Sequence, residues 1–296
     1  MKNYNNVLII YNPNAMKGKI NEYLPYIKQR LLLRFSEVDA MSSPNEDGAE
    51  QIAMKHASKY DIVVSCGGDG TLRQVINGVV KSGANSVVAV LPYGTCNDVA
   101  RTLHIPFKLD KAIDTILKLR TTKYDLIFDK EDYTIYSLAT GYMASTSYQA
   151  TSKAKKRLGR MAYAFYALKS LFKCKAKPFT VTYDGKRVHD KFIYFMLING
   201  ESAGGFKLNK GDNISNGKCK LVLIKKGKFL SGWFCFVKMF LFGIKAIAKS
   251  KNTIVEDISS LEIENHSNIP FAADGEKIKF LKKQWKISTP ITLIKK

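Results

Sequence analysis

Over the first 120 residues, short apolar runs alternate with stretches of helical apolar spacing, and this alternation constrains the fold most. Strand patterns occupy residues 7–11, 35–40, 61–65 and 87–91, and helical patterns occupy residues 20–33, 49–58, 71–80 and 95–103. Strands that alternate with helices pair in parallel, so the pattern predicts a doubly wound, Rossmann-like α/β sheet. Because ligands bind such sheets at the carboxyl ends of the strands, we expect functional residues in the loops that follow them.

The pattern changes after about Leu119, where short strand patterns follow one another instead. They occupy residues 124–128, 133–139, 179–183, 192–198, 219–224, 260–265 and 277–281. The Asp184-Gly185 pair between apolar runs is typical of a hairpin turn. Helical patterns at residues 154–172 and 229–248 interrupt these strands, so this half predicts an antiparallel sandwich or barrel. We therefore predict two domains, at residues 1–122 and 123–296.

The chain is strongly basic, because 47 Lys and Arg residues exceed 25 Asp and Glu residues by 22. Such a surface attracts nucleic acid, anionic lipid headgroups or phosphorylated substrates. A hydrophobic fraction of 46% can fill a core, which excludes a disordered chain. The five cysteines and four histidines are scattered without metal-binding spacing, which predicts free thiols in a reducing cytosol.

Residues 229–248 are apolar and about as long as a membrane-spanning helix. However, Lys238 and Lys245 lie within this segment, and each central charge disfavours spanning by about 2.5–3.5 kcal/mol. We therefore predict an amphipathic helix that packs on a sheet or lies on a membrane surface. The N-terminal residues 1–11 are typical of a first strand and lack a signal-peptide cleavage pattern.

The strongest local motif is the loop from Gly67 to Thr71, which has the sequence Gly-Gly-Asp-Gly-Thr and lies between a strand and a helix. Its glycines allow backbone N–H groups to approach a phosphate, and the helix start adds partial positive charge. Thr71 is a candidate helix cap. Asp69 would repel a bare phosphate, so we expect it to bind Mg²⁺, a ribose or a phosphate-bound water.

A second loop, residues 91–101, repeats the order strand, glycine, threonine and helix. The two loops are therefore predicted to flank one cleft. Its candidate ligands are Gly94, Thr95, Asn97 and Asp98, where the threonine donates a hydroxyl and the aspartate can contact a metal. Helix capping by Asn97 and Asp98 is the alternative.

Two weaker motifs lie near the ends of the chain. Asn12 follows the first strand, in an Asn-Pro pair that also marks an ordinary turn. Asp274 and Glu276 flank a glycine near the C-terminus. Phosphoryl transfer to an alcohol needs a carboxylate that accepts the hydroxyl proton, and either acid could supply it if this loop folds back onto the cleft. Taken alone, the motif favours the alternative of an ordinary Asp-Gly turn.

The order of these motifs resembles the soluble bacterial diacylglycerol kinase family, which is related to sphingosine and ceramide kinases and remotely to NAD kinases. The motifs are GGDGT at 67–71, P-x-G-T-x-N-D-x-A-R at 92–101 and DGE at 274–276, and they span almost the whole chain. The resemblance implies an N-terminal nucleotide-binding domain, a C-terminal antiparallel β-sandwich domain and ATP in the cleft between them. It also implies a cytoplasmic lipid kinase that works at the inner face of the membrane.

The resemblance assigns roles to individual residues. Glu276 is expected to be the proton acceptor, and Asp274 is expected to support it or the metal. Asp69 and Asp98 are expected to act around Mg²⁺ and ATP. The expected nucleotide contacts are Gly67, Gly68, Asp69, Gly70, Thr71, Thr95 and Asn12, with Ser43 matching a threonine of the family and Ser42 as an alternative.

The chain also departs from the family pattern. The family has a second-domain Asp that is linked to a structural Mg²⁺, and Asn216 stands in its place. A hard dication prefers carboxylate oxygen, so a metal held by Asn213, Asn216 and the Lys218 carbonyl is doubtful. None of the departures alters GGDGT, GTxND or DGE, so we expect an active enzyme.

A kinase that takes its substrate from a bilayer must dock on one. We predict that the helices near 154–177 and 229–248 form an anionic-membrane face, the first through its basic residues and the second through its aromatic residues. The alternatives are an NAD kinase-like enzyme and a non-catalytic basic module that binds membranes or nucleic acid. We expect no specific nucleic-acid partner, and family members suggest a homodimer.

Overall fold

The computed structural model describes residues 4–43, 48–141, 176–228 and 230–296. The chain divides into two compact units. The first unit comprises Met1–Tyr124 together with Thr289–Lys296, and the second comprises Asp125–Ser288. The sequence-based division assigned residues 289–296 to the second domain, whereas in the structure they join the first because they pair with its strands.

The first unit is built on a parallel sheet in the order β2-β1-β3-β4, and the end of β17 pairs in parallel with β4. Its strands are β1 (Asn6–Tyr11), β2 (Glu37–Ser42), β3 (Ile62–Gly67) and β4 (Val87–Pro92). All residues of β3 and β4 are buried, as expected of central strands whose two faces are both covered. The alternation in the sequence thus predicted the parallel pairing correctly.

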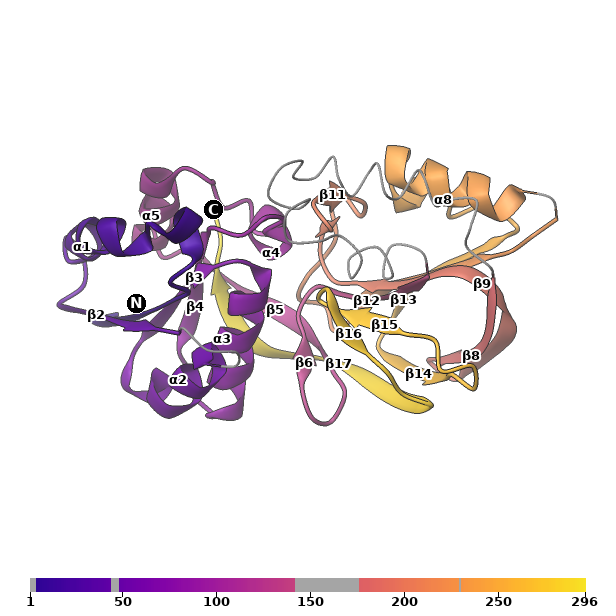
Figure 1. The fold of residues 1–296 in the computed structure, drawn as a ribbon, viewed down its shortest axis with the longest axis horizontal. Coiled ribbons are helices and arrows are strands. Elements are labelled where there is room, and N and C mark those ends of the chain that lie inside the picture. Colours follow the sequence, from indigo (N-terminus) through magenta and orange to yellow (C-terminus); the bar gives the residue numbers. More distant parts are fainter. Residues whose placement is uncertain (1–3, 44–47, 142–175, 229) are drawn as a thin grey trace. The chain divides into compact units, whose positions relative to one another are not determined.

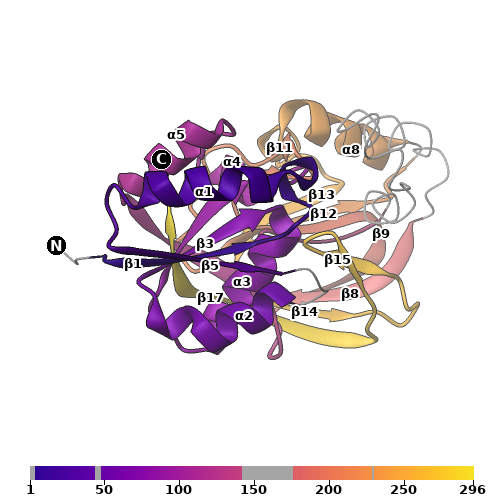
Figure 2. The same ribbon diagram turned by 60° about the vertical axis from the view of Figure 1, so that its left-hand side comes forward.

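Helices cover both faces of this sheet, with α1 and α5 on one side and α2 and α3 on the other (Figures 1 and 2). Their bounds are α1 (Ile20–Leu31), α2 (Gly48–His56), α3 (Asp69–Lys81), α4 (Asp98–Thr102) and α5 (Leu109–Leu117), with short 3-10 turns at Ala15–Gly18 and Ala57–Lys59. Gly78 lets α3 lie close to α2, because a Cβ there would stand 2.4 Å from the Glu50 carbonyl oxygen.

The second unit is antiparallel throughout its described pairs and follows the order β16-β15-β7-β9-β8-β14-β17, with β12 joining β9 to β13. Its strands are β6 (Tyr133–Thr134), β7 (Ser137–Gly141), β8 (Lys177–Tyr183), β9 (Lys186–Ile198), β10 (Ser202–Ala203), β11 (Phe206–Lys207), β12 (Cys219–Lys225), β13 (Thr253–Ile258), β14 (Ser260–Glu264), β15 (Phe271–Ala273) and β16 (Glu276–Ile278). Two strands, β5 (Thr121–Phe128) and β17 (Lys282–Ile294), run from one unit into the other. The predicted Asp184-Gly185 hairpin connects β8 to β9, and both residues have positive φ.

Strand β12 and the second half of β9, residues 192–198, are buried on both faces, and alternate residues enter two different cores. Phe195 and Leu221 belong to the core of the antiparallel sheet, whereas Tyr194 and Val222 belong to a second core under α8 (Ser231–Phe242). This arrangement explains the continuous apolar run of β9, which lacks the alternation of a half-exposed strand. In Figure 1, α8 lies over β9, β12 and β13.

Several elements differ from the sequence-based predictions. The helix predicted over 229–248 ends at Phe242, because Gly243 adopts φ 82° and breaks it, and a short 3-10 turn (Ile244–Ala246) follows. The strand predicted at 277–281 is only β16, and the long β17 begins at Lys282. Elements α5, β13 and β17 were not predicted. The helix predicted over 154–172 lies outside the described residues.

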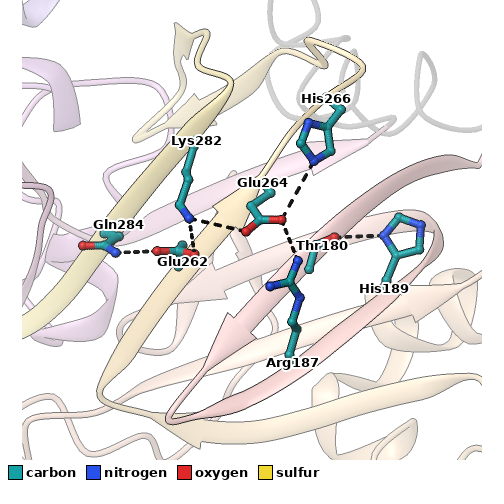
Figure 3. Close-up of polar contacts among 8 residues, drawn as sticks. All are labelled: Thr180, Arg187, His189, Glu262, Glu264, His266, Lys282 and Gln284. Atoms are coloured by element: carbon teal, nitrogen blue, oxygen red, sulfur yellow. Dashed lines mark hydrogen bonds and ion pairs between the residues drawn. The ribbon is translucent and has the colours of Figure 1, made fainter.

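The exposed face of β14 and its neighbours carries an array of ion pairs (Figure 3). Glu264 contacts Arg187 at 2.9 Å and Lys282 at 3.4 Å, and Lys282 also contacts Glu262 at 3.0 Å. Exposed pairs of this kind contribute about 0–1 kcal/mol each, so the array mainly keeps this face solvated. Among the described residues, no helix is both long enough and apolar enough to cross a membrane.

Candidate functional site

Four loops of the first unit follow the carboxyl ends of adjacent parallel strands. Tyr11 at the end of β1 pairs with Ser42 of β2 and with Cys66 of β3, and Gly67 pairs with Pro92 of β4. The loops that follow therefore leave the same edge of the sheet. This edge brings together the predicted residues Asn12, Ser43, Gly67, Gly68, Asp69, Gly70, Thr71, Gly94, Thr95, Asn97 and Asp98.

The two glycine-containing loops touch through their backbones. A Cβ on Gly94 would stand 2.4 Å from the Gly68 Cα, and a Cβ on Gly68 would stand 3.1 Å from the Gly94 Cα. Real Cβ contacts are not as short as 2.4 Å, so the backbones can approach this closely only without a side chain at Gly94. The sequence predicted that these loops flank one site, and the contact joins them directly.

The first loop is packed more tightly than its sequence suggested. Helix α3 already begins at Asp69, so Gly70 and Thr71 belong to its first turn, and its N-cap is Gly68. Thr71 does not cap the helix, because the N-cap has no side-chain bond and the Thr71 hydroxyl lies 2.5 Å from where a Gly67 Cβ would stand. The exposed residue of this turn is Gly70, with open space around its Cα.

Asn97 shapes the second loop from within. Its φ of 52° lies in the left-handed region. The Asn97 Oδ1 accepts a hydrogen bond from the Gly94 N–H, and the Asn97 Nδ2 donates one to the Gly94 carbonyl, both at 2.8 Å. The two bonds close a ring between the residues. It does not cap α4 with its side chain. Gly94 and Thr95 are the exposed residues of this loop, so they are the groups available to a ligand.

The Asp69 carboxylate lies beside the start of α4, the helix that begins with Asp98. The Asp69 Oδ1 accepts a hydrogen bond from the Val99 N–H at 3.4 Å, which places it beside the first turn of the helix that Asp98 begins. Asp69 is half-buried, whereas Asp98 is completely buried. No cluster of three His, Cys, Asp or Glu side chains that could hold a metal occurs in the described parts of the chain. One or two carboxylates can suffice for Mg²⁺, which commonly keeps several water ligands and binds phosphate oxygens as well.

The first two strand ends supply Asn12 and the serine pair. Asn12 Oδ1 accepts the Asn14 N–H at 2.8 Å and so shapes its own turn. Ser43 is buried, and its hydroxyl donates to the Tyr11 carbonyl at 3.2 Å. Ser42, the alternative in the sequence, is the exposed member of the pair.

Two other polar groups at this edge are unsuited to catalysis. Burial raises the pKa of the Cys66 thiol to about 12, so the thiolate needed for nucleophilic attack does not form near neutral pH. Burial also raises the pKa of the Tyr93 hydroxyl well above its usual value. The chemistry of this edge therefore rests on backbone N–H groups, hydroxyls and carboxylates.

In the second unit, Asp274 forms a tight turn between β15 and β16. Asp274 and Gly275 have φ of 50° and 88°, as in the two central positions of a type I′ hairpin. The Asp274 carboxylate is buried and accepts three backbone N–H groups, from Ile135 at 2.6 Å, Tyr136 at 2.9 Å and Ser137 at 3.0 Å. Its two oxygens therefore hold the turn to the backbone of residues 135–137.

Glu276 stands two residues further on and is exposed. It is the first residue of β16 and pairs with Ala273 across the hairpin. A carboxylate that is exposed on a firmly held turn suits a proton acceptor, because its oxygens can reach a substrate. Of the two acids predicted here, Glu276 thus has the geometry of a base and Asp274 that of its anchor.

The comparisons with known proteins agree with this arrangement. Residues 6–128 match the family described as "Diacylglycerol kinase catalytic domain". Over 270 residues the chain is 29% identical to a diacylglycerol kinase of Staphylococcus haemolyticus, covering 90% of this chain and 81% of that protein. It is 28% identical to a diacylglycerol kinase of Staphylococcus aureus strain MRSA252, covering 90% and 85%. The chain is a lipid kinase similar to these diacylglycerol kinases.

The fold is similar too. A crystal structure of a diacylglycerol kinase from Bacillus anthracis strain Sterne superposes with a TM-score of 0.80 at 21% identity, covering 100% of this kinase and 98% of that chain. The resemblance that the motifs suggested is thereby confirmed, as is the mixed α/β class. These similarities do not assign a role to any individual residue.

The loop of the second unit that contains Asn213 and Asn216 does not suit a structural metal ion. Asn216 Oδ1 accepts the Lys218 N–H at 3.1 Å, and Asn213 Oδ1 accepts the Ser215 N–H at 3.1 Å. Both amide oxygens are thus engaged in turns, and both side chains are neutral and exposed. We derive no role for a metal at this loop.

Sequence reasoning missed Asp125, which organises the same region. It is completely buried, and its Oδ2 accepts the Gly217 N–H at 2.9 Å. Its carbonyl accepts a hydrogen bond from the amide of Asn199, which is also completely buried. A lone aspartate inside the apolar run of β5 was the available signal, because a buried charge needs dedicated partners.

Proposed function

We propose that the kinase transfers the γ-phosphoryl group of ATP to the hydroxyl of a membrane lipid alcohol, with diacylglycerol as acceptor and phosphatidic acid as product. The observation that carries the proposal is the meeting of Gly68 and Gly94 at the carboxyl edge of the parallel sheet. Loops without Cβ atoms let N–H groups approach phosphate oxygens, and the N-terminus of α3 adds partial positive charge.

In this proposal, the first unit binds the nucleotide. The N–H groups from Gly67 to Thr71 and the exposed Thr95 hydroxyl contact the phosphates, and Asn12 and Ser43 line the pocket at the neighbouring strand ends. Asn97 acts indirectly, because its amide is already bonded to Gly94 and holds the loop in shape. Neutral donors of this kind stabilise phosphate charge without a proton transfer.

When bound, Mg²⁺ would neutralise charge on the transferring phosphate oxygens. Asp69 is the residue that we propose as its ligand, because it is half-buried and lies at the first turn of α3. Asp98 is completely buried, so it is proposed to support Asp69 electrostatically and through the start of α4.

The second unit supplies the base. The Glu276 carboxylate takes the proton of the lipid hydroxyl as its oxygen bonds to the γ-phosphorus. The bond between that phosphorus and the β,γ-bridging oxygen breaks, and ADP leaves. Asp274 keeps the turn fixed through its three backbone contacts, so that Glu276 does not have to be ordered during the reaction.

The proposed acceptor resides in a bilayer, so we also propose that the kinase is a peripheral protein of the anionic inner face of the membrane. The surplus of 22 positive charges supports this location, because anionic lipids attract a basic surface. A homodimer stays a prediction.

A phosphorylation assay with purified protein tests the proposal. Radiolabelled ATP and Mg²⁺ are combined with diacylglycerol, phosphatidylglycerol, undecaprenol or a sphingoid base in mixed micelles, and with NAD in solution. We expect label in phosphatidic acid. Label in NADP alone would favour the NAD kinase-like alternative, label in another lipid would correct the acceptor, and label in none would contradict the proposal.

The variant Glu276→Gln tests the base separately. Loss of a general base typically costs about 10²–10⁴-fold in turnover, so we expect that loss in kcat with ATP affinity retained. Glu22→Gln is the matched control, because Glu22 is an exposed glutamate on α1, remote in sequence from every predicted site residue of the second unit. Turnover of Glu276→Gln within a few-fold of the parent would rule out this role.

A further inference from the structure

Helix α8 is firmly seated on the second unit by one of its faces. Cys235, Phe236 and Met239 are 8%, 3% and 0% exposed and belong to the core formed with β9 and β12. Gly232 permits a close approach, because a Cβ there would stand 2.3 Å from the Lys225 carbonyl oxygen. The rings of Phe236 and Tyr194 also pack edge to face, with their centroids 5.1 Å apart. The inner face of the helix therefore has its partner within the chain.

The opposite face is apolar as well, although it is exposed. It consists of Leu230, Phe234, Val237, Leu241 and Phe242, which are 52%, 73%, 37%, 69% and 71% exposed, and we call it the α8 outer face. The spacing of four, three and four residues places Leu230, Phe234, Val237 and Leu241 on one side of the helix, and Phe242 extends this exposed apolar surface at the C-terminal end of the helix. Five of the twelve large apolar side chains found exposed among the described residues gather here, so this is a patch and not scattered exposure.

Positive charge surrounds the α8 outer face. Residues 213–255 contain nine lysines and no acidic residue. Two of them are neutralised, Lys220 by Asp257 and Lys225 by Asp190. Six others are exposed close to the helix: Lys226 and Lys228 before it, Lys238 within it, and Lys245, Lys249 and Lys251 after it. An apolar strip that is flanked along the chain by lysines, with no acidic residue from 213 to 255, is complementary to a layer that is apolar inside and anionic at its surface.

We propose that the α8 outer face enters the interface of an anionic bilayer, with the helix axis in the plane of the membrane. Its twelve residues are too few to span a bilayer, which takes about 20, so the helix lies along the surface. The apolar side chains occupy the boundary of the acyl chains while the lysines reach the lipid phosphates. This inference rests on the proposed function, since it identifies the surface through which that kinase meets its substrate.

Vesicle cosedimentation tests the surface. The full-length protein is mixed with vesicles of phosphatidylcholine alone or of phosphatidylcholine with phosphatidylglycerol. We expect binding to the anionic vesicles, and the double variant Phe234→Ser/Leu241→Ser should weaken it at least about tenfold, because two large apolar side chains no longer leave water. Lys238→Gln should weaken it on the order of fivefold, and only where the lipid is anionic.

Leu33→Ser is the matched control, since Leu33 is 74% exposed but follows α1 in the first unit. It should bind vesicles like the parent. Thermal unfolding of every variant separates loss of docking from loss of folding. Unchanged binding by the Phe234/Leu241 double variant would overturn the proposal, as would equal weakening by Leu33→Ser.

A fluorescent reporter tests the same surface without loss of apolar character. The double variant Trp233→Phe/Phe234→Trp moves an indole onto the α8 outer face, while the other tryptophan, Trp285, is 1% exposed and gives a constant background. We expect a blue shift on anionic vesicles and quenching by lipids that carry a bromine on the acyl chain. A spectrum that vesicles leave unchanged would overturn the proposal, and one that shifts with protein concentration alone would assign the face to a second copy of the chain.

The two proposals fail in distinguishable ways. A protein that binds vesicles through α8 but phosphorylates no lipid in micelles would contradict the proposed function alone. A protein that phosphorylates lipid in micelles and binds anionic vesicles equally well with the double variant would contradict the docking surface alone. A protein that phosphorylates lipid in micelles but does not bind anionic vesicles would contradict both the docking surface and the proposed peripheral location, and would leave the proposed phosphoryl transfer intact.

Discussion

The loops of the first unit and the turns of the second unit hold their polar groups by different means. In the first unit, Gly68 and Gly94 meet because Gly94 has no side chain, and the loop closes through the neutral amide of Asn97. In the second unit, the Asp274 carboxylate gathers three backbone N–H groups around one turn. The first arrangement depends on the lack of a side chain at Gly94, and the second depends on a carboxylate whose two oxygens both accept hydrogen bonds.

Other carboxylates of the second unit also accept hydrogen bonds from backbone N–H groups. The backbone N–H groups of Gly217, Gly200, Gly211 and Ser259 donate to Asp125, Asp212, Glu201 and Asp184 respectively. The first unit has fewer such contacts among its described residues, chiefly those of Asp61 with Asn5 and of Asp69 with Val99. The contrast indicates that added volume at Gly94 should separate the two loops of the first unit, and that neutralised carboxylates should loosen the turns of the second unit.

Adding one methyl group to the first unit should have the largest effect. In Gly94→Ala, the new Cβ would collide with the Gly68 Cα, so the two loops must separate. A displacement on the order of 1 Å can cost about 10²-fold in rate, and overpacking costs about 1–3 kcal/mol of stability. Calorimetric titration with Mg²⁺ and ATP should show a corresponding loss of affinity.

Gly48→Ala controls for the glycine-to-alanine change itself, because a Cβ there lies no closer than 3.6 Å to its neighbours. It should bind ATP like the parent. If Gly94→Ala also binds ATP normally, the close approach of the two loops is not what shapes the nucleotide site.

The substitution Asp274→Asn, which replaces one carboxylate oxygen by an amide nitrogen, should have an intermediate effect on the stability of the second unit. In Asp274→Asn, an amide nitrogen replaces one acceptor, so at least one buried N–H among Ile135, Tyr136 and Ser137 loses its partner. Each such loss costs about 1–3 kcal/mol. Denaturant unfolding should show this loss, and kcat should fall because Glu276 is held less firmly.

Asp257→Asn is the control for this change, since it removes a carboxylate of the same unit from a surface pair with Lys220. Such pairs contribute at most about 1 kcal/mol. An Asp274→Asn variant as stable as Asp257→Asn would mean that the turn does not depend on its ionised anchor.

Acid should have the smallest effect, and it should act on the second unit. Burial raises the pKa of Asp184, but hydrogen bonds from Ser259 and Ser260 outweigh it and hold the pKa below the ordinary 3.8. The pKa values of Asp129 and Asp190 are lowered in the same way, against the effect of burial, by backbone N–H groups and by a neighbouring lysine each. A lowered pKa contributes stability above the unfolded value of 3.8, and this is lost as pH falls through the folded pKa.

The expected result is a loss of stability that begins below about pH 4 and is seen first in the second unit. Asp212 works in the opposite direction, because burial raises its pKa, so the stability that its charged form costs at neutral pH is recovered as pH falls. Both tryptophans, Trp233 and Trp285, lie in the second unit, so their fluorescence reports on it alone. Hydrogen exchange of β1 and β3 reports on the first unit, and earlier exchange there would reverse the comparison. Asp184→Asn should remove part of the acid response and lower Tm by about 2–4 °C.

The sequence predicted the first unit better than the second, because the residues that form the first unit's site follow its strands directly in the chain, whereas contacting residues in the second unit are far apart in sequence. Fully buried parallel strands such as β3 show as unbroken apolar runs, and their loops follow directly in the chain. The carboxylate contacts of the second unit are distant in sequence. Asp274 lies 139 residues from Ile135, so no local pattern identifies the groups that it binds.

Some errors were local and physical. Strand β17 was missed because charged and polar residues interrupt its apolar ones, including Lys282, Lys283 and Gln284. Helix α8 was predicted too long, since the run of apolar residues continues past the break at Gly243. The ligand role of Asn97 stays a prediction, and the structure adds that its side chain contacts Gly94, three residues back, as is typical of a residue that shapes its own loop.

Strand β17 also determines when each unit can finish folding. Its end pairs with β4 through Leu293 and Val88, and the backbone N–H of Lys295 then donates to the Arg120 carbonyl. The ribosome makes all of residues 125–288 before it reaches this piece of the first unit. The unit that is translated first is therefore completed last, and until then the edge of β4 stays open to other strands.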